Sequence, residues 1–170
     1  FLYKPFTKTI LNPSCFKRDF GNRQIRFKGF MELCYLHPKY FKPDNKVLTD
    51  LKLEEADPFV LLRFVSWSAV HDRGEAGFSS EVKLKLVKEL SKHIKVFISS
   101  ENKLPEDLEQ FKLPVSPEKL HDVLFYSNLY IGEGATTASE CAMLGTPAIY
   151  VNSLSAGTLE EQEKQQLLWI

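Results

Sequence analysis

The clearest chemical signal in the sequence is a run of small and hydroxyl-bearing residues at positions 131–140, which reads Ile-Gly-Glu-Gly-Ala-Thr-Thr-Ala-Ser-Glu. It joins a stretch typical of a β-strand to the beginning of a helix. Small residues let a ligand approach the backbone, and the free N–H groups and positive dipole end of a helix attract anions. We therefore predict a phosphate or diphosphate site, with Glu140 further along the helix accepting hydrogen bonds from two sugar hydroxyls. The residues expected at the phosphates are Gly134, Ala135, Thr136 and Thr137.

The same loop also has a purely structural interpretation. Thr137 and Glu140 have the spacing of a capping box, in which each side chain satisfies a free N–H group at a helix start. A dinucleotide site has weaker support, because Thr137 stands where the third glycine of that motif is needed and the loop follows a late strand. A nucleoside-triphosphate P-loop is excluded, because Gly-Lys-Ser/Thr occurs nowhere in the chain. A phosphate site and a plain helix cap both remain open.

A second group of polar residues lies at the end of the apolar run that begins at Phe59 and in the segment after it. It includes Arg63, Ser66 and His71. Because the carboxyl ends of parallel strands meet at one edge of a sheet, we expect these side chains to converge on the small-residue loop and to face phosphate or sugar. His71 is the one candidate for a catalytic residue. The alternative is a surface histidine paired with Asp72.

A third candidate is the turn from Leu113 to Lys119. A loop at a strand end can hold a nucleobase through backbone hydrogen bonds and apolar contacts, here with Val115. The alternative is a helix cap formed by Ser116 before Pro117, which needs no ligand.

Metal chemistry has little support in the sequence. His121-Asp122 repeats the pair His71-Asp72, which is the basis for a metal phosphohydrolase hypothesis. Two-residue matches are common by chance, and no further histidine cluster accompanies them. We expect no metal and no cofactor other than the nucleotide ligand itself.

The pattern from residue 59 onward alternates short apolar runs with helical segments, which predicts an α/β fold: a Rossmann-like parallel sheet with helices on both faces. The expected strands are Phe59–Val65, Val96–Ser99, Leu129–Gly132 and Ala148–Val151. Helices are expected after Ser79 or Ser80 and over 105–111, 117–127 and 137–144, the last with Gly145 as a left-handed C-cap. A final helix is expected to begin with a Thr158–Glu161 capping box and to continue through Trp169 and Ile170.

Residues 1–50 differ from the rest of the chain. The strand-like segments Thr9–Asn12 and Gln24–Lys28 look like the end of another α/β unit, and Leu36–Asp50 is the best linker candidate. We therefore assign residues 1–48 to the end of an N-terminal Rossmann-like half plus a linker. Residues 49–170 form the predicted C-terminal domain, with an incomplete C-terminal end. We interpret the chain as a fragment, with its own missing N-terminal half as one expected partner.

The composition excludes several classes of protein. In 170 residues, 22 Lys and Arg balance 22 Asp and Glu, so the global basic field typical of nucleic-acid binding is missing. No apolar run approaches the roughly 18 residues of a membrane span, and no signal peptide is visible. The three cysteines have no disulfide or metal spacing, and we expect reduced, mostly buried thiols. We expect a cytoplasmic protein.

The stretch 134–149 has a small-residue loop, a glutamate in the following helix and Gly-Thr-Pro before a strand. It resembles the nucleotide-sugar signature of GT-B glycosyltransferases and of UDP-N-acetylglucosamine 2-epimerase. Together with residues 27–38, 63–67 and 71–72, nearly the whole chain looks like an uncharacterised prokaryotic family of that superfamily. The resemblance implies the C-terminal half of a GT-B-like fold, although Ala135 and Thr136 stand where a second glycine or a serine is commoner.

The resemblance also implies roles for individual residues. Gly134, Ala135 and Thr136 would meet the diphosphate, and Glu140 the ribose hydroxyls. The turn around Val115 would meet the base. The residues implied to face the phosphates or the sugar are Arg63, Ser66 and His71.

Three functions remain open from the sequence. The first is a UDP-sugar-binding domain of a glycosyltransferase or a sugar-nucleotide epimerase, inactive as a fragment. The second is a non-catalytic interaction module that keeps the fold, and the third, with less support, is a phosphohydrolase. Neither the sugar, the base nor the oligomeric state is determined.

Overall fold

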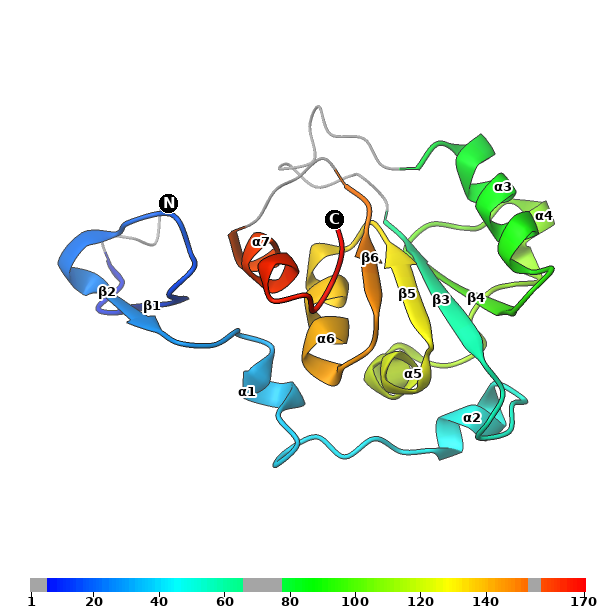
Figure 1. The fold of residues 1–170 in the computed structure, drawn as a ribbon, viewed down its shortest axis with the longest axis horizontal. Helices are drawn as coiled ribbons and strands as arrows, with labels where there is room; N and C mark the ends of the chain where they lie inside the picture. Colours follow the sequence, from blue (N-terminus) through cyan, green and yellow to red (C-terminus); the bar gives the residue numbers. More distant parts are fainter. Residues whose placement is uncertain (1–5, 66–77, 153–156) are drawn as a thin grey trace.

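A four-stranded parallel sheet lies at the centre of the molecule in the computed structural model, which describes residues 6–65, 78–152 and 157–170 (Figure 1). Its order is β4-β3-β5-β6. The strands are β3 (Phe59–Phe64), β4 (Lys95–Ser100), β5 (Leu129–Gly132) and β6 (Ala148–Tyr150). All four predicted strands are confirmed, each within one residue at either end.

Helices cover both faces of this sheet, as the alternating pattern predicted, and Figure 1 shows α6 and α7 on one side and α3 and α4 on the other. The first face carries α2 (Lys46–Asp50), α5 (Leu120–Tyr126), α6 (Ala135–Leu144) and α7 (Gly157–Lys164). The second carries α3 (Ser80–Leu90) and α4 (Glu106–Glu109). Phe59 and Leu61 of β3 pack into the first layer, and Val60 and Leu62 into the second. Strands buried on both faces need apolar side chains at successive positions, which explains the continuous apolar run.

Two helix ends follow directly from local chemistry. Ser79 is the N-cap of α3, and its side chain accepts a hydrogen bond from the Val82 N–H at 3.3 Å. Gly145 is the C-cap of α6 with a φ of 81°, a left-handed conformation that glycine adopts without strain. Both predictions are confirmed.

The beginning of α6 differs from the capping-box interpretation. The helix begins at Ala135 with Gly134 as its N-cap, so Thr137 lies inside the first turn and does not cap it. The prediction of a start at residue 137 was wrong, because glycine served as N-cap two residues before the first side chain able to cap.

The end of the chain also differs from the prediction. Thr158 lies within α7 and is not its N-cap, and the helix stops at Lys164. Trp169 then pairs in parallel with Ile149 of β6, and backbone bonds join Trp169 to Tyr150 and Ala148 at 2.8 and 2.9 Å. The predicted continuation of the helix was wrong, because Leu168 becomes buried in the core and the next residues gain partners along the edge of the sheet.

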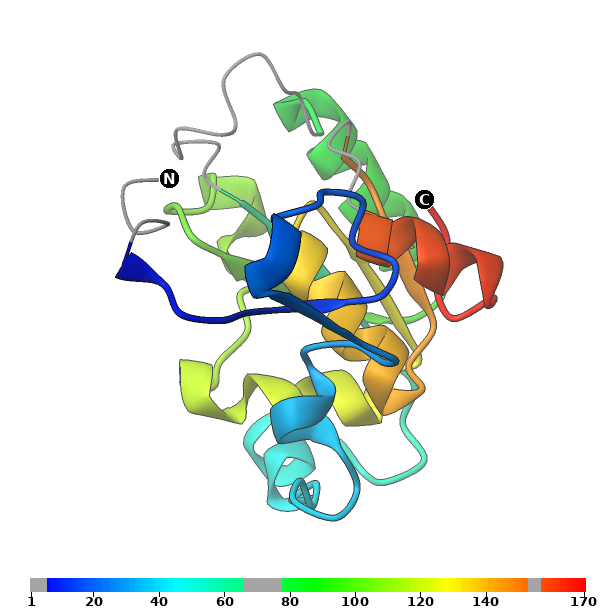
Figure 2. The same cartoon turned by 90° about the vertical axis from the view of Figure 1, so that its left-hand side faces the viewer.

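The N-terminal residues form a separate, two-stranded parallel sheet of β1 (Ile10–Pro13) and β2 (Gln24–Phe27), joined by a loop that ends in a 3-10 turn over Gly21–Arg23. Figures 1 and 2 show this pair on the outer side of α6 and α7, away from the main sheet. An ion pair at 2.7 Å joins Lys17 to Glu160 of α7. The N-terminal segment therefore contacts the main domain through specific side chains.

The stretch predicted as a linker, Leu36–Asp50, contains one short helix, α2, near its end. Another short helix, α1 (Leu33–Leu36), ends at its first residue, and a turn and irregular residues separate the two. Val47 and Leu48 of α2 are buried in the core on the same face of the main sheet as α5 and α6. Two apolar residues on one turn of α2 therefore pack against the domain, and the proposed boundary between residues 48 and 49 falls within this helix.

The cysteines are reduced, but they are not mostly buried. Cys141 is buried, Cys15 is half-buried and Cys34 is exposed. Within the described part of the chain, no helix has the length and apolar character needed to cross a membrane.

Candidate functional site

Arg63 and the small-residue loop lie together at the carboxyl edge of the sheet. The register places Arg63 beside Ser99 of β4 on one side and Gly132 of β5 on the other. Its guanidinium donates to Ser99 Oγ at 2.8 Å and pairs with Glu101 at 3.2 Å. A Cβ atom built on Gly134 would lie only 3.5 Å from Arg63 Nε. The tertiary structure thus brings together two of the groups singled out in the sequence.

Gly132 is required by close packing behind the loop. A Cβ at this position would overlap the Tyr130 hydroxyl and lie 2.9 Å from the Arg63 carbonyl oxygen. Tyr130 is completely buried, and its hydroxyl donates to the Gly134 carbonyl oxygen at 3.4 Å. Burial raises the pKa of Tyr130, so this hydroxyl keeps its proton. The loop is therefore supported from below by a neutral hydrogen-bond donor.

Glu133, between the two glycines, has a role that the sequence analysis did not predict. Its carboxylate is buried and accepts the backbone N–H groups of Val65 and Phe78 at 2.9 and 2.7 Å. Lys83 Nζ lies 3.4 Å from the same carboxylate. A buried carboxylate needs such partners to offset the loss of water. Glu133 thus joins the end of β3, the residue before the N-cap of α3 and the loop after β5.

The first turn of α6 presents the predicted phosphate-binding residues. Gly134 supplies no side chain to cap the free N–H groups of this turn. Gly134 and Ala135 are half-buried and Thr136 is exposed, whereas Thr137 is buried and hydrogen-bonds to Tyr130. The Thr137 hydroxyl therefore points inward, and only its backbone N–H is left for a ligand.

Glu140 lies farther along α6, where that helix meets α1 and α5. Its Oε1 accepts the Tyr35 hydroxyl at 3.0 Å and lies 3.1 Å from His121 Nε2. The Glu140 side chain is 10% exposed, and among the described residues no donor reaches its Oε2. Burial, followed by the negative charge of Glu140, raises the pKa of Tyr35. Glu140 is thus a fixed carboxylate with one oxygen still open.

The remaining predicted site residues lie in the turn after Lys112 or outside the described residues. Lys112 pairs in parallel with Ile98 of β4, so the chain after it runs toward the carboxyl edge, with Val115 half-buried against the core. Ser116 is the N-cap residue of a 3-10 turn, but its hydroxyl donates to Glu118 at 2.6 Å and caps no N–H group. Ser66 and His71 lie outside the described residues.

The described residues contain no set of ligands that supports the metal hypothesis. His121 faces Glu140, whereas Asp122 accepts the Asp44 N–H at 2.9 Å. Across residues 6–65, 78–152 and 157–170, no three His, Cys, Asp or Glu side chains are grouped as metal ligands.

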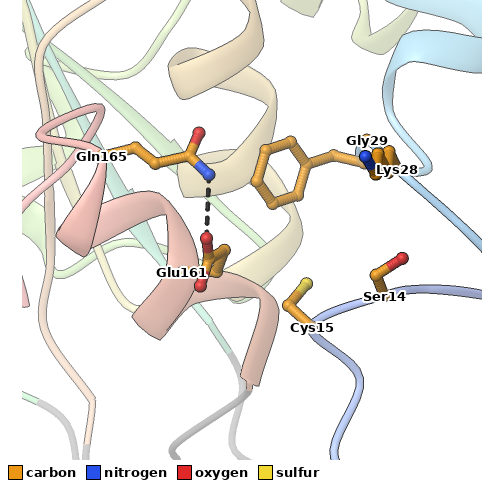
Figure 3. A pocket seen from close by; sticks show the side chains of 7 residues that line it. Ser14, Cys15, Lys28, Gly29, Glu161 and Gln165 are labelled. Carbon is orange, nitrogen blue, oxygen red and sulfur yellow. Dashed lines mark hydrogen bonds between the residues drawn. The ribbon is translucent and has the colours of Figure 1, made fainter.

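A separate pocket of about 510 Å³ lies between the N-terminal segment and α7 (Figure 3). Gln165 donates to Glu161 at 3.0 Å on one wall, and Cys15 and Lys28 stand on the other. Burial raises the pKa of Cys15. None of the residues predicted to bind a ligand lines this pocket.

Comparison with known proteins places most of the chain in one family. Residues 4–158 match a family model described as "Protein of unknown function (DUF354)". No curated protein matches the sequence.

Two solved structures are similar to part of this chain. The beta Kdo 2,7 transferase KpsC of Thermosulfurimonas dismutans is 14% identical, with a TM-score of 0.41 over 73% of this chain and 47% of that one. The wall teichoic acid polymerase TagF is 15% identical, with a TM-score of 0.46 over 86% of this chain and 40% of that one. The chain spans less than half the length of either protein.

Proposed function

We propose that this chain, which belongs to the family described as "Protein of unknown function (DUF354)", binds the nucleotide part of a nucleotide-sugar. The observation that carries the proposal is Glu140, a carboxylate fixed on α6 with one oxygen free, on the same helix whose first turn offers uncapped N–H groups. The first turn binds the diphosphate, and Glu140 accepts the ribose hydroxyls.

The diphosphate end is supported by backbone geometry and a nearby cation. Free N–H groups at a helix start, together with the helix dipole, favour an anion without a dedicated side chain. The exposed Thr136 hydroxyl adds a donor, and Arg63 Nε passes beside Gly134. Because Arg63 also pairs with Glu101, it supplies a partly neutralised charge, and the backbone provides most of the binding.

The ribose end is supported by the spacing along α6. Glu140 stands five residues after Ala135, which corresponds to roughly 7–8 Å along the helix axis. The ribose and phosphate groups of one nucleotide can bridge such a span. A carboxylate acts only as an acceptor, so it suits a pair of hydroxyl groups and repels phosphate, which gives the ligand a direction along the helix.

The reaction class follows from the sequence resemblance to GT-B glycosyltransferases and UDP-N-acetylglucosamine 2-epimerase. We assign the chain to a nucleotide-sugar enzyme that transfers or epimerises the sugar. A non-catalytic module would use the same nucleotide site, so turnover of UDP-N-acetylglucosamine by the natural full-length protein separates the two.

Calorimetric titration with UDP, UDP-N-acetylglucosamine, GDP and ADP tests the nucleotide site. We expect one base to bind and the binding to disappear in Glu140→Ala. Glu106→Gln, an exposed carboxylate on α4, serves as a control and should bind like the parent. Equal affinity of the parent and Glu140→Ala would contradict the proposed function.

A further inference from the structure

We propose that the Tyr35 hydroxyl occupies the position on Glu140 that a ligand hydroxyl takes, so that Tyr35 limits the affinity of this site for a diol. This inference rests on the proposed function, in which Glu140 binds ribose. It assigns a specificity-determining role to a residue of the N-terminal segment, 105 positions away in sequence.

Glu140 can accept only a limited number of hydrogen bonds. A carboxylate has about four acceptor positions, two on each oxygen. Oε1 already receives the Tyr35 hydroxyl at 3.0 Å and His121 Nε2 at 3.1 Å, so it is full. A ribose whose two hydroxyls bind both oxygens must therefore displace one of these donors.

The two donors differ in how firmly the fold holds them. His121 belongs to α5, which is anchored by Val123 and Leu124, both completely buried. Tyr35 belongs to the four-residue helix α1, whose N-cap makes no side-chain bond, and is 43% exposed. Displacing Tyr35 breaks one ring contact, with His121, whereas displacing His121 breaks two, with Tyr35 and with Phe41. Tyr35 is therefore the partner that a ligand replaces.

Replacing the Tyr35 hydroxyl with a sugar hydroxyl leaves the number of hydrogen bonds to Glu140 unchanged. The raised pKa of Tyr35 keeps its hydroxyl protonated, so it donates to Glu140 as a sugar hydroxyl would. One O–H donor replaces another, and the carboxylate loses no hydrogen bond. The free energy of releasing Tyr35 is then subtracted from that of ligand binding.

Tyr35→Phe separates the hydroxyl from the rest of the side chain. The Tyr35 ring lies 5.6 Å from the His121 ring, and phenylalanine keeps this contact. The variant should therefore fold normally while leaving one position on Oε1 open. Tyr40→Phe is a matched control, because Tyr40 is 67% exposed and contacts His37 and Lys39 away from Glu140.

The test compares the affinities of UDP, GDP and ADP, and of their 2′-deoxy counterparts, for the parent, Tyr35→Phe and Tyr40→Phe. We expect Tyr35→Phe to bind the ribonucleotide about 2–10-fold more tightly, the range of one hydrogen bond. The gain should be smaller for the 2′-deoxy nucleotide, and Tyr40→Phe should match the parent.

Failure of the inference is distinguishable from failure of the proposed function. If Glu140→Ala abolishes binding but Tyr35→Phe binds equally or more weakly, Tyr35 does not compete and the inference is overturned. If no nucleotide binds to the parent or to Tyr35→Phe, or if Glu140→Ala binds like the parent, the proposed function falls and the inference falls with it.

Discussion

Glu133 and Lys83 form an ion pair behind the candidate phosphate loop, with 3.4 Å between Lys83 Nζ and Glu133 Oε2. The Glu133 side chain is fully buried, and that of Lys83 is 19% exposed and lies over the Phe64 ring. The carboxylate also holds two backbone N–H groups, those of Val65 and Phe78. Residues from three elements therefore depend on one charge.

Removing that carboxylate should destabilise the fold strongly. In Glu133→Ala, the two N–H groups and the Lys83 ammonium lose their acceptor, and we expect the free energy of unfolding to fall by about 3–5 kcal/mol. Glu133→Gln keeps one acceptor oxygen and should lose less. Urea denaturation provides the measurement, with Glu89→Ala, which breaks an exposed pair with Lys92, as the control. A loss in Glu133→Ala no larger than in the control would show that the pair is not important for stability.

The two loop glycines should respond differently to the same substitution. In Gly132→Ala, the new methyl group meets the Tyr130 hydroxyl and the Arg63 carbonyl oxygen, one of which is backbone and cannot yield. We expect a loss of about 1–3 kcal/mol in the free energy of unfolding, as for other overpacked sites. Gly134→Ala is the matched control, because its Cβ meets nothing closer than 3.5 Å and its φ of −88° suits alanine. Comparable thermal unfolding of the two variants would refute this steric account.

The titration of Tyr35 should depend on Glu140. The pKa of Tyr35 lies above its ordinary value of 10.0 because of burial and the neighbouring carboxylate. Glu140→Gln removes the negative charge, so we expect the pKa of Tyr35 to fall toward that value. The ultraviolet absorbance of phenolate during a pH titration measures this, and Tyr35→Phe identifies which part of the signal belongs to Tyr35. An unchanged titration in Glu140→Gln would mean that the two side chains are not in contact in solution.

The raised pKa of Tyr35 also determines the direction in which the free energy of unfolding changes at alkaline pH. The folded state holds the Tyr35 proton more tightly than the unfolded state does. The contribution of this group is therefore complete below pH 10, the unfolded pKa, and is lost as the pH rises through the higher folded value. Glu140→Gln should reduce this alkaline loss, which thermal unfolding at several pH values can detect.

Local sequence patterns predicted most of the main sheet because its strands are buried on both faces. Such strands need runs like Phe-Val-Leu-Leu at the beginning of β3, and the helices between them carry local stop signals such as Gly145. Predictions failed where a distant contact decided the local structure. The segment after Lys164 leaves the helix to pair with β6.

The sequence by itself determined the parallel α/β sheet, the small-residue loop at Gly134 and the position of Glu140 on the helix after it, because these depend on residues close together in the chain. Only the tertiary structure decided how the side chains of the site are used. Glu133 binds the backbone of residues 55 and 68 positions away, and Tyr35 reaches Glu140 over 105. Hydrogen bonds of this kind leave no periodic signal in the sequence, because their partners meet only after the chain has folded.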